Sequence, residues 1–573
     1  MGNCVEGPTS QSQKSVDNNN KNSPMNRDTS KKSGNPQKKS ISKTSSNTIH
    51  SGILVEHNDD VYAKYKETEM LGQGSMGHVA KVILKEKRLS QKGSFVDNAD
   101  AATAPAPSYA LKSIQLDRVS KSFIQELENE IGILKTMDHP NIVKLHEVFS
   151  HKKQIYMILE LCDGGDLYTR LPYTEQDAAY ITGKLLSAIK YLHDHAIVHR
   201  DLKFENIMFE NSGPNAEIKV IDFGLSKKFV SHKMGVMRDG VGTLYSMAPQ
   251  VLQGVYTSKA DMWSVGVIVY MLLSSHRPFY SKQRKIMIDR IMRCDYSFRK
   301  KYWIPISDEA KDFIDQLLVL DPTKRNDAEM AQRHKWMDME FKLEDRAPTE
   351  ALTGRVTAKL SGFKNNNRLK KLALNVIAHR STTDEIIQLR KAFDQFDTAN
   401  AGVITLKEFQ AALQEKCSYS DEEIREMFDS IDINKNGHIM YTEFIAASLE
   451  AQGQLDVDRI AEAFNRFDVD STGFISKENM LQFLGDTGAT MEDVDQMISA
   501  ADMGRSGAVS FDEFMAMFRS EREETSSTMT ISLKSYEKMT KPNVDVESSD
   551  DDDDRSQLMG IDARIPGGKH ESS

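Results

Sequence analysis

Residues 199–206 read His199-Arg-Asp-Leu-Lys-Phe-Glu-Asn206, and Asp222-Phe-Gly224 follows a short distance along the chain. Upstream, Leu71-Gly-Gln-Gly-Ser-Met-Gly-His-Val79 forms a glycine-rich loop, and Tyr109-Ala-Leu-Lys112 places a lysine in a strand-like run behind it. Glycines let a backbone approach phosphate groups closely and leave its N–H groups free to bind them. Each motif alone is typical of an ordinary turn or a solvated charge, but the ordered set predicts a phosphate-handling site.

In order and spacing, these motifs resemble those of eukaryotic protein kinases over residues 65–337. The resemblance implies that Asp201 accepts the proton of the substrate hydroxyl and that Lys203 neutralises the transferred phosphoryl group. It also implies that Asn206 and Asp222 hold Mg²⁺. Such a site supplies charge compensation and in-line positioning rather than covalent chemistry.

The same resemblance implies that Lys112 contacts the ATP phosphates while it is paired with Glu130, in the helical segment 123–137. Lys203 and Thr243 together resemble the serine/threonine class. The residues expected to contact the nucleotide are Leu71, Gly72, Gly74, Gly77, Val79, Ala110, Lys112, Glu160, Cys162, Asp166 and Asp222.

Two acidic residues bear on the expected substrate, and two residues depart from the protein kinase pattern. Glu205 and Asp166 match acids that attract an arginine three residues before the phosphoacceptor in related kinases, so we expect protein substrates with basic residues there. Phe204 stands where a proline is usual, and Gln250 stands where a glutamate normally pairs with an arginine, here Arg325. Because no catalytic group is lost, the sequence still predicts an enzyme.

Residues 384–518 contain 27 acidic and 10 basic side chains and repeat a pattern that starts at Asp397, Asp432, Asp468 and Asp502. Each repeat predicts an EF-hand, in which oxygen ligands alternate along a loop of about 12 residues and a final glutamate binds Ca²⁺ through both oxygens. The loops are 397–408, 432–443, 468–479 and 502–513. The expected ligands are Asp432, Asn434, Asn436, the His438 carbonyl and Glu443, then Asp468, Asp470, Thr472, the Phe474 carbonyl and Ser476, then Asp502, Ser506, Ser510 and Glu513.

The four loops differ in quality. The second is nearly complete, whereas Asn479 replaces the final glutamate of the third and Gly504 removes a ligand from the fourth. In the first, Ala399 and Ala401 occupy ligand positions. We expect Ca²⁺ at the second loop, weaker binding at the third and fourth, and a structural role for the first.

Between these two parts, residues 351–380 have apolar side chains at helical spacing among lysines and arginines, with seven basic and no acidic residues in 355–380. A basic amphipathic helix is the kind of ligand that a calmodulin-like groove accepts. The alternative is a connecting helix with a solvated basic face. The apolar positions are Leu352, Val356, Leu360, Phe363, Leu369, Leu372 and Val376.

In this order of parts, the chain resembles the calcium-dependent protein kinases of plants and protists. The resemblance implies a bilobal α+β kinase domain (65–337), a junction that inhibits the kinase (338–381) and an all-α calmodulin-like domain (382–518). We expect disorder in the Ser/Asn/Lys-rich residues 1–60 and the acidic tail 519–573. The implied activity is Ca²⁺-activated transfer of the ATP γ-phosphate to protein Ser/Thr.

The composition limits the cellular locations and the binding partners that we expect for the protein. No apolar run is long enough to span a bilayer, and four scattered cysteines form no disulfide or zinc framework, as in a cytoplasmic protein. The start Met1-Gly2-Asn3-Cys4 resembles acylated family members, although Glu6 departs from the myristoylation pattern. The basic stretches lack interleaved aromatics, so we expect no nucleic-acid partner.

Two other interpretations remain open at this point. A pseudokinase scaffold would use the calcium sensor to recruit partners, and only Phe204 and Gln250 favour it. An enzyme with purely structural EF-hands would show no calcium control.

Overall fold

The structure is a computed structural model that describes residues 55–73, 77–85, 107–228, 242–338, 350–414, 419–453, 455–485 and 489–519. All of them belong to one unit of the chain, Asn47–Ser573. Gly74 and the two expected acylation sites, Gly2 and Cys4, lie outside these ranges. The expectation of disorder up to residue 60 is wrong for residues 55–60, because a strand begins at Val55 and pairs with the kinase sheet.

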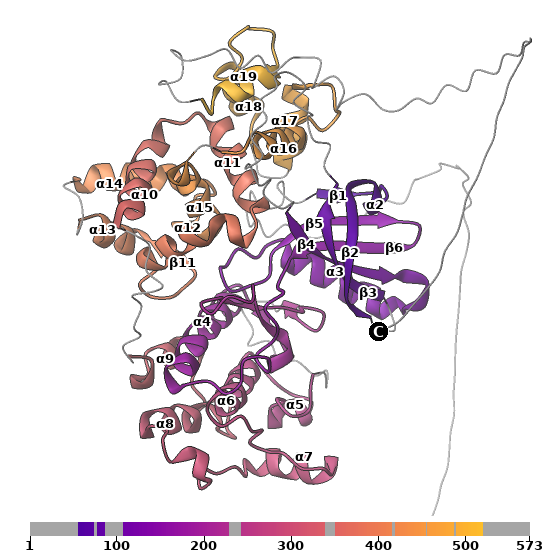
Figure 1. The fold of residues 1–573 in the computed structure, drawn as a ribbon, viewed down its shortest axis with the longest axis vertical. Helices are drawn as coiled ribbons and strands as arrows, with labels where there is room; N and C mark the ends of the chain where they lie inside the picture. Colours follow the sequence, from indigo (N-terminus) through magenta and orange to yellow (C-terminus); the bar gives the residue numbers. More distant parts are fainter. Residues whose placement is uncertain are drawn as a thin grey trace, which may run out of the picture. The chain divides into compact units, whose positions relative to one another are not determined.

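The first part of the kinase domain is a six-stranded sheet in the order β1-β5-β6-β4-β3-β2 (Figure 1). Strands β2 to β6 pair antiparallel, and β1 pairs parallel to β5. The pairing of β3 with β4 sets Val79 opposite Lys112, so the lysine follows directly behind the glycine-rich loop. The strands are β1 (Val55–His57), β2 (Tyr65–Gln73), β3 (Gly77–Leu84), β4 (Ser108–Gln115), β5 (Leu145–His151) and β6 (Gln154–Glu160).

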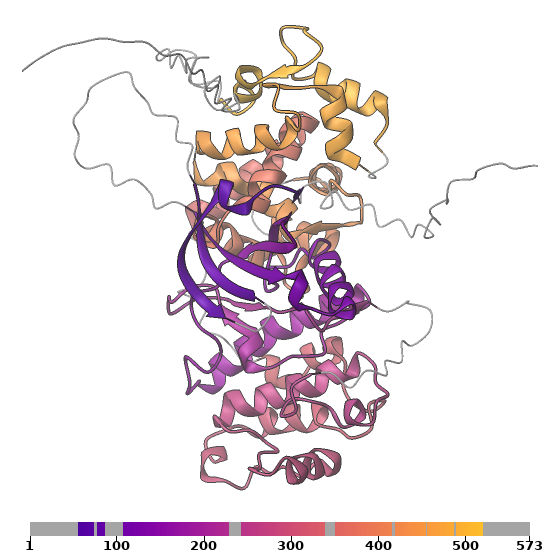
Figure 2. The ribbon, with the colours of Figure 1, turned by 90° about the vertical axis from the view of Figure 1, so that its right-hand side faces the viewer.

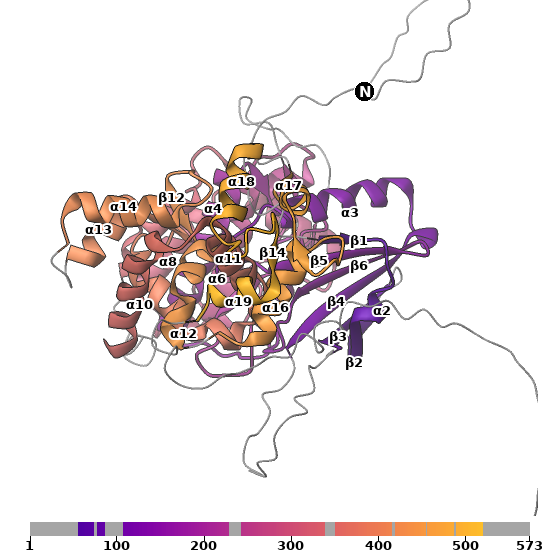
Figure 3. The ribbon, with the colours of Figure 1, turned by 90° about the horizontal axis from the view of Figure 1, so that it is seen from above.

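Helix α3 (Lys121–Leu134) lies beside this curved sheet, as Figures 2 and 3 show. Ser120 starts the helix by accepting a hydrogen bond from the Phe123 amide, a normal N-cap. Leu127 and Ile131, one turn apart, are buried with the sheet residues of the same core. That packing turns Glu130, which lies between them, toward the catalytic cleft. The short α2 (Val61–Lys64) and η1 (Leu116–Arg118) complete this lobe.

The helical lobe is built around α4 (Glu175–Asp194) and α6 (Lys259–Ser274). A capping box between Thr174 and Asp177 starts α4. Almost every side chain of α6 is buried, so this helix runs through the core rather than along its surface. The other elements are β7 (Ile197–Val198), η2 (Phe204–Asn206), β8 (Ile207–Phe209), β9 (Ile218–Val220), β10 (Lys227–Lys228), α5 (Pro249–Leu252), α7 (Arg284–Arg293), η3 (Lys301–Trp303), α8 (Asp308–Leu317), α9 (Ala328–Gln332) and η4 (Lys335–Asp338).

The predicted repeats form two EF-hand pairs, each joined by a short antiparallel strand pair. Strand β11 (Val403–Thr405) pairs with β12 (His438–Met440), and β13 (Phe474–Ile475) pairs with β14 (Val509–Ser510). The helices are α12 (Thr383–Phe396), α13 (Leu406–Gln414), α14 (Asp421–Ile431), α15 (Tyr441–Ser448), η7 (Leu449–Gln452), α16 (Val457–Phe467), α17 (Lys477–Leu484), α18 (Met491–Ser499) and α19 (Phe511–Ala516).

The junction forms two helices rather than one. Helix α10 (Glu350–Gly362) and the turn η6 (Phe363–Asn365) precede α11 (Arg368–Arg380), which Asn367 caps by accepting from the Lys370 amide. All seven predicted apolar positions of the junction are buried in one core with the EF-hand helices. The junction therefore packs into the EF-hand module.

Candidate active site and calcium-binding loops

Asp201 lies in the loop 199–206, and both of its carboxylate oxygens are hydrogen-bonded. Its Oδ1 accepts from the Thr243 amide at 2.8 Å and the Thr243 hydroxyl at 2.7 Å. Its Oδ2 accepts from Lys203 Nζ at 2.6 Å and Asn206 Nδ2 at 3.2 Å. The structure thus brings together the three predicted catalytic-loop residues and Thr243, in a geometry that can orient a hydroxyl and offer it a carboxylate base.

The catalytic loop is held by Asp261, a fully buried carboxylate at the start of α6. It accepts from the backbone amides of His199 and Arg200, both at 2.9 Å, and from His193 Nε2 at 3.0 Å. Although burial would raise the pKa of Asp261, these hydrogen bonds and the nearby histidines hold it below its usual value. This anchoring fixes Arg200 in a left-handed conformation, φ 71°, that a non-glycine residue rarely adopts.

Lys112 and Glu130 form the predicted ion pair, with Nζ 2.7 Å from Oε1. Asp222 lies 3.9 Å from the same Nζ, so the lysine joins the α3 carboxylate to the Asp222-Phe-Gly224 segment. Burial would lower the pKa of Lys112, but attraction by Glu130 and Asp222 outweighs it and raises the pKa. The lysine therefore stays charged and suited to phosphate oxygens.

Asn206 and Asp222 fit an Mg²⁺ ion. The Asn206 amide nitrogen donates to the Asp201 carbonyl at 2.9 Å, so its oxygen is left for a cation. The Asp222 carboxylate is about half exposed, with 49% of its side-chain surface accessible, and faces the cleft beside Lys112. Carboxylate and amide oxygens are the ligands that Mg²⁺ prefers.

The residues expected to contact the nucleotide include Gly77, Glu160 and Cys162. At Gly77, any side chain would collide with the β4 backbone, since an added Cβ would lie 1.7 Å from the Ser113 carbonyl oxygen. The Glu160 carboxylate instead accepts from Lys219 at 2.7 Å and Thr383 at 2.9 Å. The Glu160 carboxylate is therefore already paired within the protein. Cys162 is buried, and burial raises the pKa of its thiol.

Both departures from the kinase pattern are accommodated. The Phe204 ring is fully buried and packs on Tyr168, with centroids 4.9 Å apart. The side-chain oxygen of Gln250 accepts from Arg325 Nη2 at 3.3 Å, as predicted, whereas its buried Nε2 has no hydrogen-bond partner. Gln250 therefore keeps the contact with Arg325 but buries an amide nitrogen that has no hydrogen-bond partner.

The four calcium loops share one backbone geometry. In the second loop, Asp432 accepts from the amides of Asn436 and Gly437, at 3.2 and 3.0 Å, and Glu443 accepts from the amides of Ile433 and Asn434. The carboxylates of the other loops accept equivalent backbone bonds. The bends use glycines in the left-handed region, with Gly437 at φ 85°. In the described residues, the donors are mixed carboxylate, amide and hydroxyl oxygens, a set that suits Ca²⁺.

The first loop, poor in ligands, contacts the kinase domain directly. The backbone of Gly402 lies so close to His139 that an added Cβ would be 2.0 Å from the imidazole. The carbonyl of Asn400 accepts from Gln332 Nε2 at 3.0 Å, and Asp394, just before the loop, pairs with Lys184 at 3.0 Å.

Further contacts join the first EF-hand pair to the kinase domain. Arg390 of α12 forms a bidentate ion pair with Glu210, and both side chains are buried. The Thr442 hydroxyl and amide donate to the Asp138 carboxylate, at 2.6 and 3.0 Å for the two shortest contacts. Thr442 immediately precedes Glu443, the expected bidentate calcium ligand.

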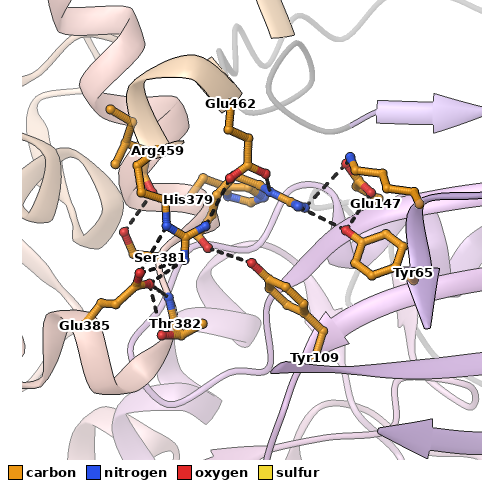
Figure 4. Close-up of polar contacts among 12 residues, drawn as sticks. Tyr65, Tyr109, Glu147, His379, Ser381, Thr382, Glu385, Arg459 and Glu462 are labelled. Carbon is orange, nitrogen blue, oxygen red and sulfur yellow. Dashed lines mark hydrogen bonds and ion pairs between the residues drawn. The ribbon is translucent and has the colours of Figure 1, made fainter. Parts of the chain in front are cut away.

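The end of α11 completes this interface, as Figure 4 shows. His379 Nε2 lies 3.1 Å from the Leu145 carbonyl oxygen. Arg380 contacts the sheet through Tyr65 at 3.0 Å and Glu147 at 3.5 Å, and the EF-hand helix α16 through Glu462 at 2.7 Å. Burial would raise the pKa of Glu147, but Arg380 and Lys64 hold it well below its usual value. These charges link the junction, the sensor and the kinase sheet.

Sequence reasoning missed Asp261 and the interface residues. Asp261 had a local signal, since it is the acidic residue that begins the long apolar run of α6. Asp138, Glu210 and Thr442 have none, because each is an ordinary polar residue whose partner lies more than 170 residues away.

Comparison with known proteins agrees with this architecture. The protein kinase domain family matches residues 65–337, and the EF-hand domain pair family matches 387–449 and 457–519. Calcium-dependent protein kinase 5 of Plasmodium falciparum is 33% identical over 481 residues, which cover 82% of this chain and 80% of the relative. Calcium-dependent protein kinase 2 of Zea mays is 33% identical over 479 residues (82% and 88%), and calcium-dependent protein kinase 17 of Arabidopsis thaliana is 32% identical over 476 (82% and 85%). With kinase and sensor joined in one chain at this level of identity, the protein belongs to the calcium-dependent protein kinase family.

Proposed function

We propose that this chain, a Ca²⁺-activated serine/threonine kinase that uses Mg·ATP, is inhibited by its own junction without Ca²⁺ and released when its EF-hands bind Ca²⁺. In this proposal, Asp201 positions and deprotonates the substrate hydroxyl, and Lys203 neutralises the transferred phosphoryl group. Lys112, held by Glu130, binds the ATP phosphates. Asn206 and Asp222 would hold Mg²⁺, which supplies charge compensation on the phosphates when bound.

The observation that carries the regulatory proposal is the position of α11. Its apolar residues are buried among EF-hand helices, and Arg380 at its end contacts Glu147 of the kinase sheet. The cleft has the Lys112–Glu130 pair and the Asp201 network in place. We infer that this arrangement is the active state, in which the sensor holds the junction, and that the junction leaves this position when Ca²⁺ is removed.

In the same proposal, the four loops have different roles because their sets of calcium ligands differ. The second loop binds Ca²⁺ with Asp432, Asn434, Asn436, the His438 carbonyl and Glu443. Thr442, next to Glu443, then couples that site to Asp138 of the kinase domain. The third and fourth loops bind more weakly, and the first loop, packed on His139, serves as a docking element.

Hydrogen exchange on the full chain tests the switch. In Ca²⁺, the amides of α11 should be protected by their packing on the EF-hand helices, and in a chelator their exchange should rise by tenfold or more, about 1.4 kcal/mol. Kinase activity measured on the same samples should fall in the chelator. Equal protection of α11 in both conditions, together with a change in activity, would refute the junction as the moving part.

We also propose a substrate preference and a membrane association, which rest on individual residues rather than on the fold. Glu205 and Asp166 support a preference for protein substrates with basic residues before the Ser/Thr. Acylation of Gly2 and Cys4 would give peripheral membrane association. Among the described residues, no helix has the length and apolar character needed to cross a membrane. Fractionation of a Gly2→Ala protein tests the acylation, and a distribution identical to wild type would contradict it.

A further inference from the structure

Arg277, in the loop between α6 and α7, packs against Tyr245 and Tyr168. Its guanidinium carbon lies 4.2 Å from the centroid of the Tyr245 ring. Its Nη2 donates to the Tyr168 hydroxyl at 2.9 Å. Stacking and a directed hydrogen bond together fix a guanidinium more firmly than either alone. Arg277 therefore holds a defined position rather than extending into solvent.

Tyr245 connects this guanidinium to Glu205. The Tyr245 hydroxyl donates to Glu205 Oε2 at 2.5 Å and accepts from the Phe204 amide at 3.2 Å. A proline at 204 would have no N–H to donate, so the replacement supplies the bond that anchors Tyr245. The buried Phe204 ring also packs on Tyr168, the other partner of Arg277. The unusual Phe204 and the guanidinium thus belong to one network.

The network contains two opposite charges, the Arg277 guanidinium and the Glu205 carboxylate. Partial burial would lower the pKa of Arg277, but the Tyr168 hydrogen bond and, to a smaller extent, the Glu205 carboxylate raise it. Tyr245 links the two charged groups, because its ring stacks on the Arg277 guanidinium and its hydroxyl donates to Glu205. A substrate arginine that approaches Glu205 must share this carboxylate with Arg277 and Tyr245.

We propose that Arg277 is a specificity-determining residue that partly neutralises Glu205 and so weakens the preference for an arginine three residues before the phosphoacceptor. The inference rests on the proposed function, in which Glu205 reads that arginine. Peptides with a neutral residue at this position remain substrates, because the Arg277 guanidinium supplies part of the positive charge that would otherwise have to come from a substrate arginine beside Glu205.

Paired peptide kinetics test this idea in the full chain at saturating Ca²⁺. Two serine peptides differ only in Arg or Ala three residues before the serine, and the ratio of their kcat/KM values is measured for each variant. Arg277→Gln removes the charge and keeps a hydrogen-bond donor for Tyr168. We expect the ratio to rise roughly two- to fivefold, the range of a partly exposed charge contact. Because both peptides are measured on one preparation, a loss of folded protein cancels in the ratio.

Two matched variants separate the possible failures. Arg293→Gln, which removes an exposed arginine of α7, should leave the ratio at its wild-type value. Glu205→Gln should lower the ratio toward one. An unchanged or lower ratio in Arg277→Gln, with the expected loss in Glu205→Gln, overturns the role of Arg277 alone. A wild-type ratio in Glu205→Gln instead overturns the substrate part of the proposed function, and the present inference with it.

Discussion

The guanidinium of Arg390, in the first helix of the calcium sensor, forms a bidentate ion pair with Glu210 of the kinase domain, and both side chains are buried. Such a pair gains little net free energy over an apolar contact, but it is very sensitive to the loss of one partner. This property suits a contact that must form in only one arrangement of two domains.

Replacing Arg390 should therefore uncouple the sensor from the kinase. In Arg390→Ala, Glu210 would remain buried without its partner, at a cost of about 3–5 kcal/mol. We expect a lower melting temperature in Ca²⁺ and a clear loss of Ca²⁺-stimulated activity. The control is Arg425→Ala, an exposed arginine of α14. Unchanged calcium stimulation in Arg390→Ala would show that the ion pair does not couple the domains.

The catalytic assignment predicts a loss of turnover without a loss of nucleotide binding. Asp201→Asn keeps the size of the side chain but removes the base and its charge. We expect kcat to fall by about 10² to 10⁴, while the affinity for Mg·ATP changes little. Activity and nucleotide binding are measured on the same protein. A variant with near wild-type kcat would exclude Asp201 as the base.

Because the calcium loops differ in their ligands, the same substitution should change the calcium dependence of activity by different amounts in different loops. Glu443→Gln removes the bidentate ligand of the second loop and should raise the free Ca²⁺ needed for half-maximal activity on the order of tenfold. Glu408→Gln, the same change in the first loop, should shift it less than about twofold. Equal shifts would mean that the first loop is also a calcium sensor.

Gln250 offers a stabilising substitution. Arg325 is buried, and burial lowers its pKa to about 10, while the amide nitrogen of Gln250 has no partner. Gln250→Glu would replace a weak neutral contact with a charged one and remove the unsatisfied nitrogen. We expect a gain of about 1–2 kcal/mol in unfolding free energy, measured by urea titration. Exposed Gln253→Glu is the control and should change stability by less than about 0.5 kcal/mol.

His139 predicts the direction of a pH effect. Burial, reinforced by Lys184 and Lys219, lowers its pKa to about 3, so the folded protein keeps this histidine neutral. The unfolded chain binds the proton below pH of about 6.5, so His139 destabilises the fold as the pH falls from there toward 3. Its share is about 1.4 kcal/mol per pH unit. In urea titrations between pH 7 and 5.5, the slope should be smaller in His139→Gln by a difference that grows with falling pH and approaches one proton near pH 5.5, and an equal slope would contradict this assignment.

The sequence predicted local features well and distant contacts poorly. The catalytic set is recognisable because Asp201, Lys203 and Asn206 lie within one loop, and the EF-hands because their ligands repeat within 12 residues. The apolar spacing of the junction correctly predicted which side chains are buried, but not the break between α10 and α11 at Asn366 and Asn367. The break did have a local signal, because Asn367 is a favourable N-cap residue and accepts from the Lys370 amide at the start of α11.

The interface and the Arg277 network lay beyond sequence reasoning for a related reason. The contacts of the Glu160 carboxylate with Lys219 and Thr383 could not be predicted, because only the fold brings these residues to it. Phe204 looked like a weakness of the catalytic loop. Its backbone amide in fact donates to the Tyr245 hydroxyl, a contact that depends on two distant segments meeting in space.

Calcium control of the kinase is measured most directly through phosphate transfer from Mg·ATP to a basic serine peptide, with the full chain and free Ca²⁺ buffered from about 10 nM to about 50 µM. We predict low activity at the lowest Ca²⁺ and a steep rise across this range, which Glu443→Gln moves to higher Ca²⁺. Activity that stays constant over the whole range would contradict it.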